Sequence, residues 1–142
     1  MPYKSVEGFA MADVAFEASG KTLEELFASC AEALTSTMIK DPKELGVKEG
    51  KRFTLEAKDA EFLLHDFLQE LLFLKDAELL LFREYKLKIE KAEKGMKLTA
   101  TMLGDHLDPT KQTLLVDAKA VSWHMFKVEK SRVWKAFFIV DL

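Results

Sequence analysis

Acidic groups stand at the ends of two apolar segments of this chain. Asp141 and the main-chain carboxylate of Leu142 follow the apolar run 136–140, and Asp13 precedes an alternating segment at 14–18. Hard cations such as Ca²⁺ and Mg²⁺ prefer carboxylate and carbonyl oxygens as ligands. These three residues are therefore candidate ligands of a divalent cation, although a chain end that is merely exposed and charged explains the pattern equally well.

Two other acidic groups are weaker candidates for metal or proton chemistry. The segment 104–112 contains Asp105, His106 and Asp108, but its Gly-Asp and Asp-Pro steps are typical of an exposed turn region. On a predicted helix, Asp66 lies beside Glu70 at a spacing of four residues. For both groups a solvated surface is the commoner explanation, and we expect it here.

A serine-hydrolase arrangement is the only enzymatic motif that the sequence suggests. Ser122 and His124 are two residues apart on a predicted strand, and Asp117 is close in sequence. A nucleophilic serine usually occupies a sharp turn with backbone donors around it, and no glycine occurs within ten residues on either side. We therefore expect His124 to be a hydrogen-bonded strand residue that lines a cleft.

Other enzyme classes lack sequence support. The chain has no phosphate-binding glycine loop, no dinucleotide fingerprint and no HExxH pair. Its single cysteine, Cys30, excludes an intrachain disulfide and a thiolate zinc cluster, and its place in a helical apolar pattern predicts a buried, inert thiol. We expect an accessory protein that is not an enzyme.

Composition and length predict one globular domain over residues 1–142. The chain is 49% hydrophobic and carries a net charge of −3, with 21 basic residues spread among 24 acidic ones. Because phosphate neutralisation needs clustered basic residues, strong direct nucleic-acid binding is not expected. Without a spanning segment, a signal pattern or a lipidation motif, the protein is expected in the cytoplasm and not at a membrane.

Hydrophobic periodicity and turn signals predict two helices and a mostly antiparallel sheet. The first helix begins with a capping box at Thr22 and ends before Pro42, and the second begins after Asp59 and places His65, Asp66 and Gln69 on a narrow polar side. Strands are predicted around 14–18, 53–57, 79–89, 96–102, 115–121, 122–129 and 133–140. The expected fold is a two-layer α+β domain with a sheet of about six or seven strands.

Five segments, in this order and at this spacing, resemble the archease family. The similarity covers nearly the whole chain, and the segments are Asp13-Val14 followed by Gly20, the sequence TLEELF at 22–27 with the region 31–38, HDFLQELLFLKDAELLLF at 65–82, VDAKAVSWHMFKVE at 116–129, and the final IVDL. The resemblance implies a small α+β protein that activates the RtcB-type RNA ligase of tRNA splicing by promoting guanylylation of the ligase and restoring its turnover. A chaperone-like binding module for RNA-modifying enzymes is the alternative function.

The resemblance also implies a site and a partner. It maps a divalent-cation site to Asp13, Asp141 and Leu142, with Ca²⁺ expected first and Mg²⁺ or Mn²⁺ as alternatives. It maps a functional lysine to Lys119, and we expect His124 and Asp66 to face the partner with it. The family commonly reads Glu-His-Thr-Ala-Asp before the first aspartate ligand, whereas this chain reads FAMAD at 9–13 and so lacks the acidic residue and the histidine.

Overall fold

The computed structural model describes residues 2–8 and 13–142 of the chain. The helices and strands follow one another as β1 (Tyr3–Val6), β2 (Asp13–Gly20), α1 (Leu23–Ser36), the 3₁₀ turn η1 (Pro42–Glu44), β3 (Glu49–Ala57), α2 (Ala60–Glu78), β4 (Leu80–Ala92), β5 (Gly95–His106), β6 (Ala120–Val121), β7 (Lys127–Lys130) and β8 (Trp134–Asp141). This order confirms the predicted α+β class with two helices.

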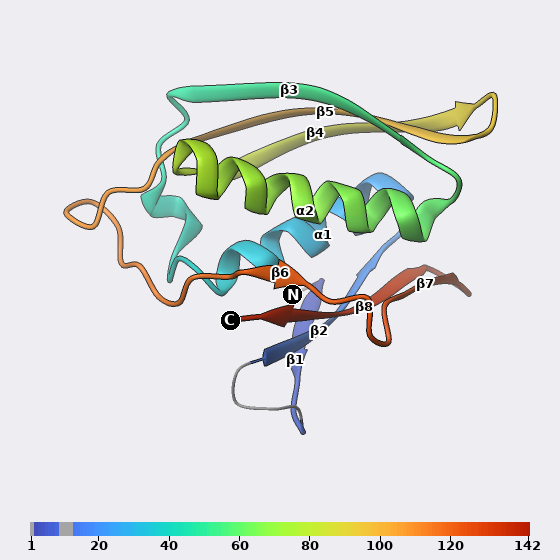
Figure 1. Cartoon of the computed structure of the whole chain (residues 1–142), viewed down its shortest axis with the longest axis horizontal. Helices are drawn as coiled ribbons and strands as arrows, with labels where there is room; N and C mark the ends of the chain where they lie inside the picture. The colour runs from blue at the N-terminus through green and yellow to red at the C-terminus, as the bar shows by residue number, and fades with distance from the viewer. Residues whose placement is uncertain (1, 9–12) are drawn as a thin grey trace.

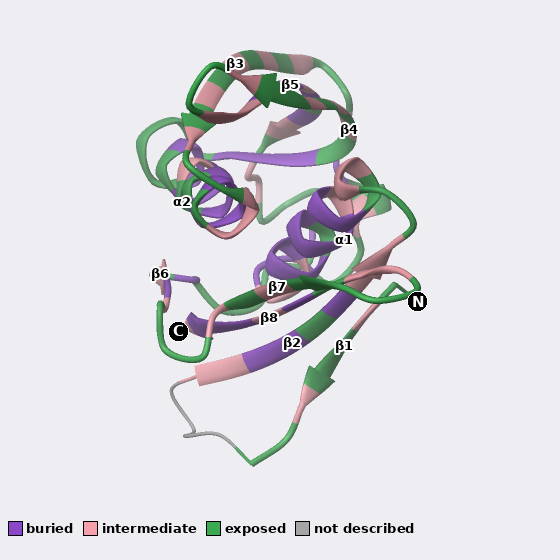
Figure 2. Ribbon diagram, turned by 90° about the vertical axis from the view of Figure 1, so that its right-hand side faces the viewer, coloured by how far each residue is buried: buried purple, intermediate pink, exposed green. Residues whose placement is uncertain are grey.

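The strands form two antiparallel sheets, and both helices lie between them (Figures 1 and 2). One sheet has the order β3-β5-β4, and the other has the order β1-β2-β8-β6, with β7 also paired to β8. The sequence predicted a single sheet of six or seven strands, whereas the structure divides eight described strands between two sheets. Periodicity reports only that a strand has one buried face, and therefore could not assign strands to sheets.

Both helices begin at the predicted capping residues. The Thr22 side chain accepts a hydrogen bond from the Glu25 N–H, and the Asp59 side chain accepts one from the Phe62 N–H. These bonds satisfy backbone donors that the first helical turn leaves without partners. The second helix ends at Leu79, which adopts the left-handed conformation with φ 56°.

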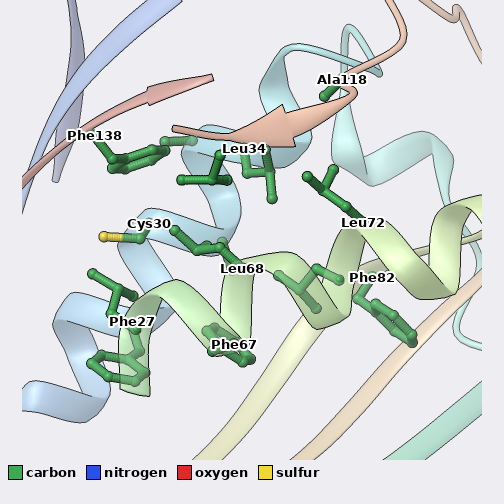
Figure 3. Close-up of a cluster of buried hydrophobic side chains, with 14 of the residues drawn as sticks. Phe27, Cys30, Leu34, Phe67, Leu68, Leu72, Phe82, Ala118 and Phe138 are labelled. Carbon is green, nitrogen blue, oxygen red and sulfur yellow. The ribbon is translucent and has the colours of Figure 1, made fainter. Parts of the chain in front are cut away.

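The main core is formed where the two helices meet each other and the sheets (Figure 3). The rings of Phe27 and Phe67 stack with their centroids 5.7 Å apart. Phe138 reaches this core from β8, and its ring lies 5.5 Å from that of Phe16 on β2. Burial of each such side chain contributes about 1.5–3 kcal/mol, so helix–helix and helix–sheet contacts hold the layers together.

Paired side chains of β2 and β8 point alternately to the inner and the outer face of the five-stranded sheet. Phe16 pairs with Phe138 on the inner face, and Glu17 pairs with Phe137 on the outer face. Because successive side chains alternate between faces, the pairs formed by Asp13 with Asp141 and by Glu17 with Phe137 share the outer face.

At Gly104 the three-stranded sheet leaves no room for a side chain. Gly104 on β5 pairs with Phe82 next to a register shift in β4, and a Cβ atom at Gly104 would lie 1.9 Å from the main-chain oxygen of Leu81. The strands predicted at 79–89 and 96–102 are confirmed, and they pair as the antiparallel hairpin of β4 and β5. Strand β5 continues to His106, however, so Asp105 and His106 lie on a strand and not in the predicted loop.

The two long strands predicted at 115–121 and 122–129 are wrong. Only Ala120–Val121 and Lys127–Lys130 form strands there, and both pair with the same edge of β8. The chain leaves that edge in between through a turn in which the Phe126 N–H donates to Trp123 O over 3.1 Å. Within residues 2–8 and 13–142, no helix is long and apolar enough to cross a membrane.

Candidate functional site

An acidic pair forms where β2 begins and β8 ends. Asp13 lies directly opposite Asp141 in the antiparallel register, a position in which Cβ atoms are about 4.5–5.5 Å apart. Partial burial raises the pKa of Asp141, and the neighbouring Asp13 carboxylate raises it further by repulsion and by hydrogen bonding. The structure therefore brings together two of the predicted ligands from opposite ends of the chain.

The segment before β6 adds Lys119 to this pair. Ala120 pairs with Asp141 on the side opposite to Asp13, and the Lys119 N–H donates to Asp141 O over 2.8 Å. The positive charge of the exposed Lys119 side chain partly offsets the rise in the pKa of Asp141. Leu142 follows directly, half-buried against the core cluster. Four predicted site residues therefore lie in one neighbourhood.

The donors of this neighbourhood fit a hard cation. Asp13 and Asp141 offer side-chain carboxylates, and the main chain of Leu142 offers further oxygens, which are the donor types that Ca²⁺ and Mg²⁺ prefer. In the part of the chain that the structure describes, no group of three or more His, Cys, Asp or Glu side chains could hold a metal. A cation at this position would therefore depend on main-chain oxygens in addition to the two side chains.

The polar side predicted for α2 binds the main chain of the segment that follows Lys119. Gln69 Oε1 accepts from the Val121 N–H, and His65 Nε2 donates to Val121 O, both over 2.8 Å. One helical turn earlier, Glu61 Oε2 accepts from the Val128 N–H over 2.9 Å. Along residues 121–128, side chains of α2 thus bind main-chain groups that β8 does not pair.

His65, which the sequence places on the polar side of the helix, is buried because Trp123 covers it. The two rings stack at 3.8 Å with an interplanar angle of 9°, and the ring of Phe126 contacts the same imidazole edge-on at 5.1 Å. Burial lowers the pKa of His65, and its hydrogen bond to Val121 and the charge of Asp66 only partly oppose this effect. No local pattern marked His65, since its cover comes from a distant segment.

The hydrolase arrangement is not assembled. The Ser122 hydroxyl accepts from the backbone N–H of His124, while Asp117 is bonded to Lys75. His124 is exposed and lies in a turn, so the prediction that it occupies a strand is wrong. The next residue, Met125, has φ 58° and is 57% exposed, a backbone conformation that is uncommon for a residue with a side chain.

The remaining sequence candidates lie apart from the acidic pair. Asp66 is exposed on α2. Asp105 accepts from the His106 N–H at the end of β5, and Asp108 accepts from the backbone N–H and hydroxyl of Thr110 in the following turn. The segment Phe9–Ala12, where the sequence departs from the family pattern, lies outside the described residues.

Lys75 is a site-forming residue that sequence reasoning missed. Its ammonium donates to Asp117 Oδ1 at 2.5 Å, to Asp76 Oδ1 at 2.6 Å and to Ala118 O at 2.8 Å. The Lys75 side chain is only 4% exposed. A lysine in the last turn of a helix is ordinarily a solvated residue, so nothing in the local sequence signalled its burial.

A groove of about 370 Å³ lies across the outer face of the five-stranded sheet. Its lining includes Lys4, Glu17, Lys127, Lys135 and Phe137, and does not include the acidic pair. The groove contains ion pairs of Lys4 with Glu17 and of Lys127 with Glu129. Both pairs are exposed and therefore contribute little to the free energy of folding. The candidate site is therefore the acidic pair with Lys119, and not this groove.

Comparison with known proteins identifies relatives along almost the entire chain. Residues 3–142 match the model of the archease protein family. The chain is 39% identical over 133 residues to protein archease of Pyrococcus abyssi, and 40% identical over 133 residues to protein archease of Thermococcus kodakarensis. Each match covers 92% of this chain and 93% of the relative.

Solved structures share the fold. The solution structure of protein 1598 from Methanobacterium thermoautotrophicum matches with a TM-score of 0.85 and 32% identity, and the match covers 99% of each chain. The crystal structure of an archease from Thermotoga maritima, described as a possible chaperone, matches with a TM-score of 0.61 and 20% identity over 94% of this chain and 93% of that one. The second likeness concerns the fold alone.

Proposed function

The chain belongs to the archease family, and we propose on that basis that it activates an RtcB-type RNA ligase in tRNA splicing. It promotes guanylylation of the ligase and restores ligase turnover, without joining RNA itself. The partner is a protein, which agrees with the net charge of −3 and the scattered basic residues.

The observation that carries this proposal is the convergence of Asp13, Asp141 and Lys119 at one end of the five-stranded sheet. The register of β2 and β8 sets the two carboxylates opposite each other, and the hydrogen bond from the Lys119 N–H to Asp141 O brings the lysine alongside them. A site with two carboxylates and one ammonium can bind a cation and an anionic group side by side.

A divalent cation, with Ca²⁺ expected first and Mg²⁺ or Mn²⁺ as alternatives, would be held by Asp13, Asp141 and main-chain oxygens of Leu142. It would supply a concentrated positive charge that can attract phosphate or carboxylate oxygens of the partner. The Asp13–Asp141 repulsion favours such a ligand, because a bound cation relieves it. Lys119 contributes a second, fixed positive charge beside the same position.

Three residues are proposed to face the ligase. Lys119, His124 and Asp66 are all exposed, so each is free to meet a partner. They belong to different parts of the surface, since Lys119 lies beside the acidic pair, His124 lies in the turn after β6, and Asp66 lies on α2. We assign the activating role to Lys119 and a contact role to the other two.

The test is single-turnover guanylylation of a purified RtcB-type ligase, followed with radiolabelled GTP, in the presence and absence of this protein. We expect stimulation by the intact protein and at least tenfold less with Asp141→Asn or Lys119→Met. The matched control is Glu93→Gln, which changes an exposed carboxylate in the turn between β4 and β5. Failure of the intact protein to stimulate would refute activation, and full stimulation by Asp141→Asn would refute the role of the acidic pair.

A chaperone-like binding module is the second candidate, favoured by an exposed apolar surface. Phe62 and Trp123 lie with their ring centroids 4.9 Å apart and are 39% and 49% exposed, and Met125 in the same turn is 57% exposed. Contiguous exposed apolar groups often mark binding surfaces. Suppression of light scattering by an aggregating test protein, lost in Trp123→Ser but not in Glu93→Gln, would support this candidate; no suppression by the intact protein would exclude it.

A further inference from the structure

Lys75 places a positive charge inside the protein next to the proposed site. Its side chain is 4% exposed, and its ammonium is surrounded by Asp117, Asp76 and the carbonyl of Ala118. Burial by itself would lower the pKa of Lys75, but the bonds to Asp117 and Asp76 outweigh burial and leave the pKa raised. The group is therefore charged at neutral pH, the state in which the ammonium can donate to all three oxygens.

These bonds fix the chain immediately before Lys119. Ala118 is fully buried (Figure 3), and its carbonyl is satisfied by Lys75. Upstream, Val116 is attached to the end of α1 by a hydrogen bond from its N–H to Thr37 O over 3.0 Å. Between this attachment and Lys119, the ammonium of Lys75 binds the side chain of Asp117 and the carbonyl of Ala118.

Downstream, two further main-chain groups of the same segment are hydrogen-bonded. The Lys119 N–H donates to Asp141 O, and the Val121 N–H donates to Gln69 on the same helix as Lys75. Since Lys75 and Gln69 both belong to α2, one rigid helix holds the segment on both sides of Lys119. A slip of one residue would turn Lys119 to the other side of β6.

We propose that Lys75 is the positioning residue that holds Lys119 beside the Asp13–Asp141 pair, through its bonds to Asp117 and to the carbonyl of Ala118. This inference rests on the proposed function, because it assigns Lys75 a role in presenting the activating lysine. Asp117 is 68% exposed in its side chain, so it does not require an ion pair for its own solvation. The bonds from Lys75 to Asp117 and Ala118 therefore order the segment 117–119, whereas they add little to the solvation of the Asp117 carboxylate.

The experiment compares Lys75→Met, Lys75→Arg and Asp117→Asn in the intact chain. Lys75→Met keeps most of the unbranched side chain and removes the charge. Asp117→Asn weakens the bond to Lys75 at an exposed position and leaves the core unchanged. The matched control is Lys51→Met, which breaks an ion pair of similar length between β3 and Glu78, in the same last turn of α2 as Lys75. The readouts are ligase guanylylation and NMR hydrogen exchange of the Lys119 and Val121 amides.

We expect Lys75→Met to accelerate exchange of the Lys119 amide by at least about tenfold, which corresponds to about 1.4 kcal/mol of local opening. Stimulation of the ligase should fall to the level of Lys119→Met. The double variant Lys75→Met, Lys119→Met should stimulate the ligase as much as either single variant does. Asp117→Asn should show a smaller loss of both properties, Lys75→Arg should restore both, and Lys51→Met should match the wild-type protein.

Two results would overturn the inference. One is full stimulation by Lys75→Met, and the other is lost stimulation with the Lys119 amide as protected as in the wild-type protein. If the wild-type protein does not stimulate the ligase at all, the proposed function fails instead. In that case the exchange measurement alone still decides whether Lys75 positions the segment.

Discussion

Replacement of Asp141 by asparagine should change stability in opposite directions with and without a divalent cation. Asp141 faces Asp13 across an antiparallel pair, at a Cβ separation of about 5 Å. Two unit charges at about 5 Å repel each other by about 0.8 kcal/mol in a dielectric of about 80, and by about 3.3 kcal/mol in one of about 20. Both carboxylates are partly exposed at the end of the sheet, so we take a cost close to the lower value, about 1 kcal/mol.

The direction in which stability changes with pH follows from the raised pKa of Asp141. Its ordinary value is 3.8, and the folded protein holds the proton more tightly than the unfolded chain does. Stability is therefore complete at low pH and falls as pH rises above 3.8. In EDTA at pH 7, Asp141→Asn should raise the free energy of unfolding by about 1 kcal/mol and Tm by about 3 °C, and this gain should disappear near pH 3.

With a divalent cation present, the wild-type protein should be more stable than Asp141→Asn. A ligand at about one hundred times its Kd stabilises the protein that binds it by about 2.7 kcal/mol. The wild-type protein should gain this amount, whereas Asp141→Asn has lost one of two carboxylate ligands and should gain much less. Thermal unfolding followed by circular dichroism in EDTA, Ca²⁺, Mg²⁺ and Mn²⁺ measures both effects, with Glu93→Gln as the control that changes charge elsewhere.

Two outcomes would contradict this reasoning. If Asp141→Asn destabilises the protein in EDTA, the two carboxylates do not repel each other. If a cation raises the Tm of the variant as much as that of the wild-type protein, the cation binds somewhere else.

Four further outcomes are expected. Because burial lowers the pKa of His65, stability should fall as pH drops below 6.5, and His65→Gln, whose amide can still donate to the same carbonyl, should reduce the change in Tm between pH 7.5 and pH 5. Trp123→Ala removes ring contacts with His65 and with two phenylalanines and should cost about 1–2 kcal/mol in urea unfolding; an unchanged midpoint would mean that the stack contributes nothing. Cys30 is fully buried and burial raises the pKa of its thiol, so a thiol reagent should react with it only after denaturant is added. Gly104→Ala places a Cβ against a carbonyl oxygen and should cost more than about 3 kcal/mol, which the yield of folded protein and its Tm would report.

Elements that depend on neighbouring residues were predictable from the sequence. The capping residues Thr22 and Asp59 bond amides within their own first turns, and both bonds occur as expected. The hairpin of β4 and β5 follows from alternation on either side of a short turn, and it was also found. Such patterns are local, so no knowledge of the rest of the chain was needed.

Features that depend on distant contacts were not predictable. His65 carries a polar side chain on a helix and looks solvated until Trp123 covers it. Alternation at 115–129 suggested two strands, but β8 has only one free edge there, and the segment can occupy it only in two short pieces. Sequence patterns do not show which edges are already occupied.

The acidic pair shows the same division. The sequence alone determined that Asp13 and Asp141 carry hard oxygen donors at the ends of two strands, because residue type and alternation specify that much. Only the tertiary structure decided that these strands are neighbours in register, that the Lys119 N–H bonds to Asp141, and that a buried Lys75 binds the preceding carbonyl of Ala118. The pairing of β2 with β8 joins opposite ends of the chain. It is stabilised by a core to which both helices and both sheets contribute side chains, so no local pattern specifies it.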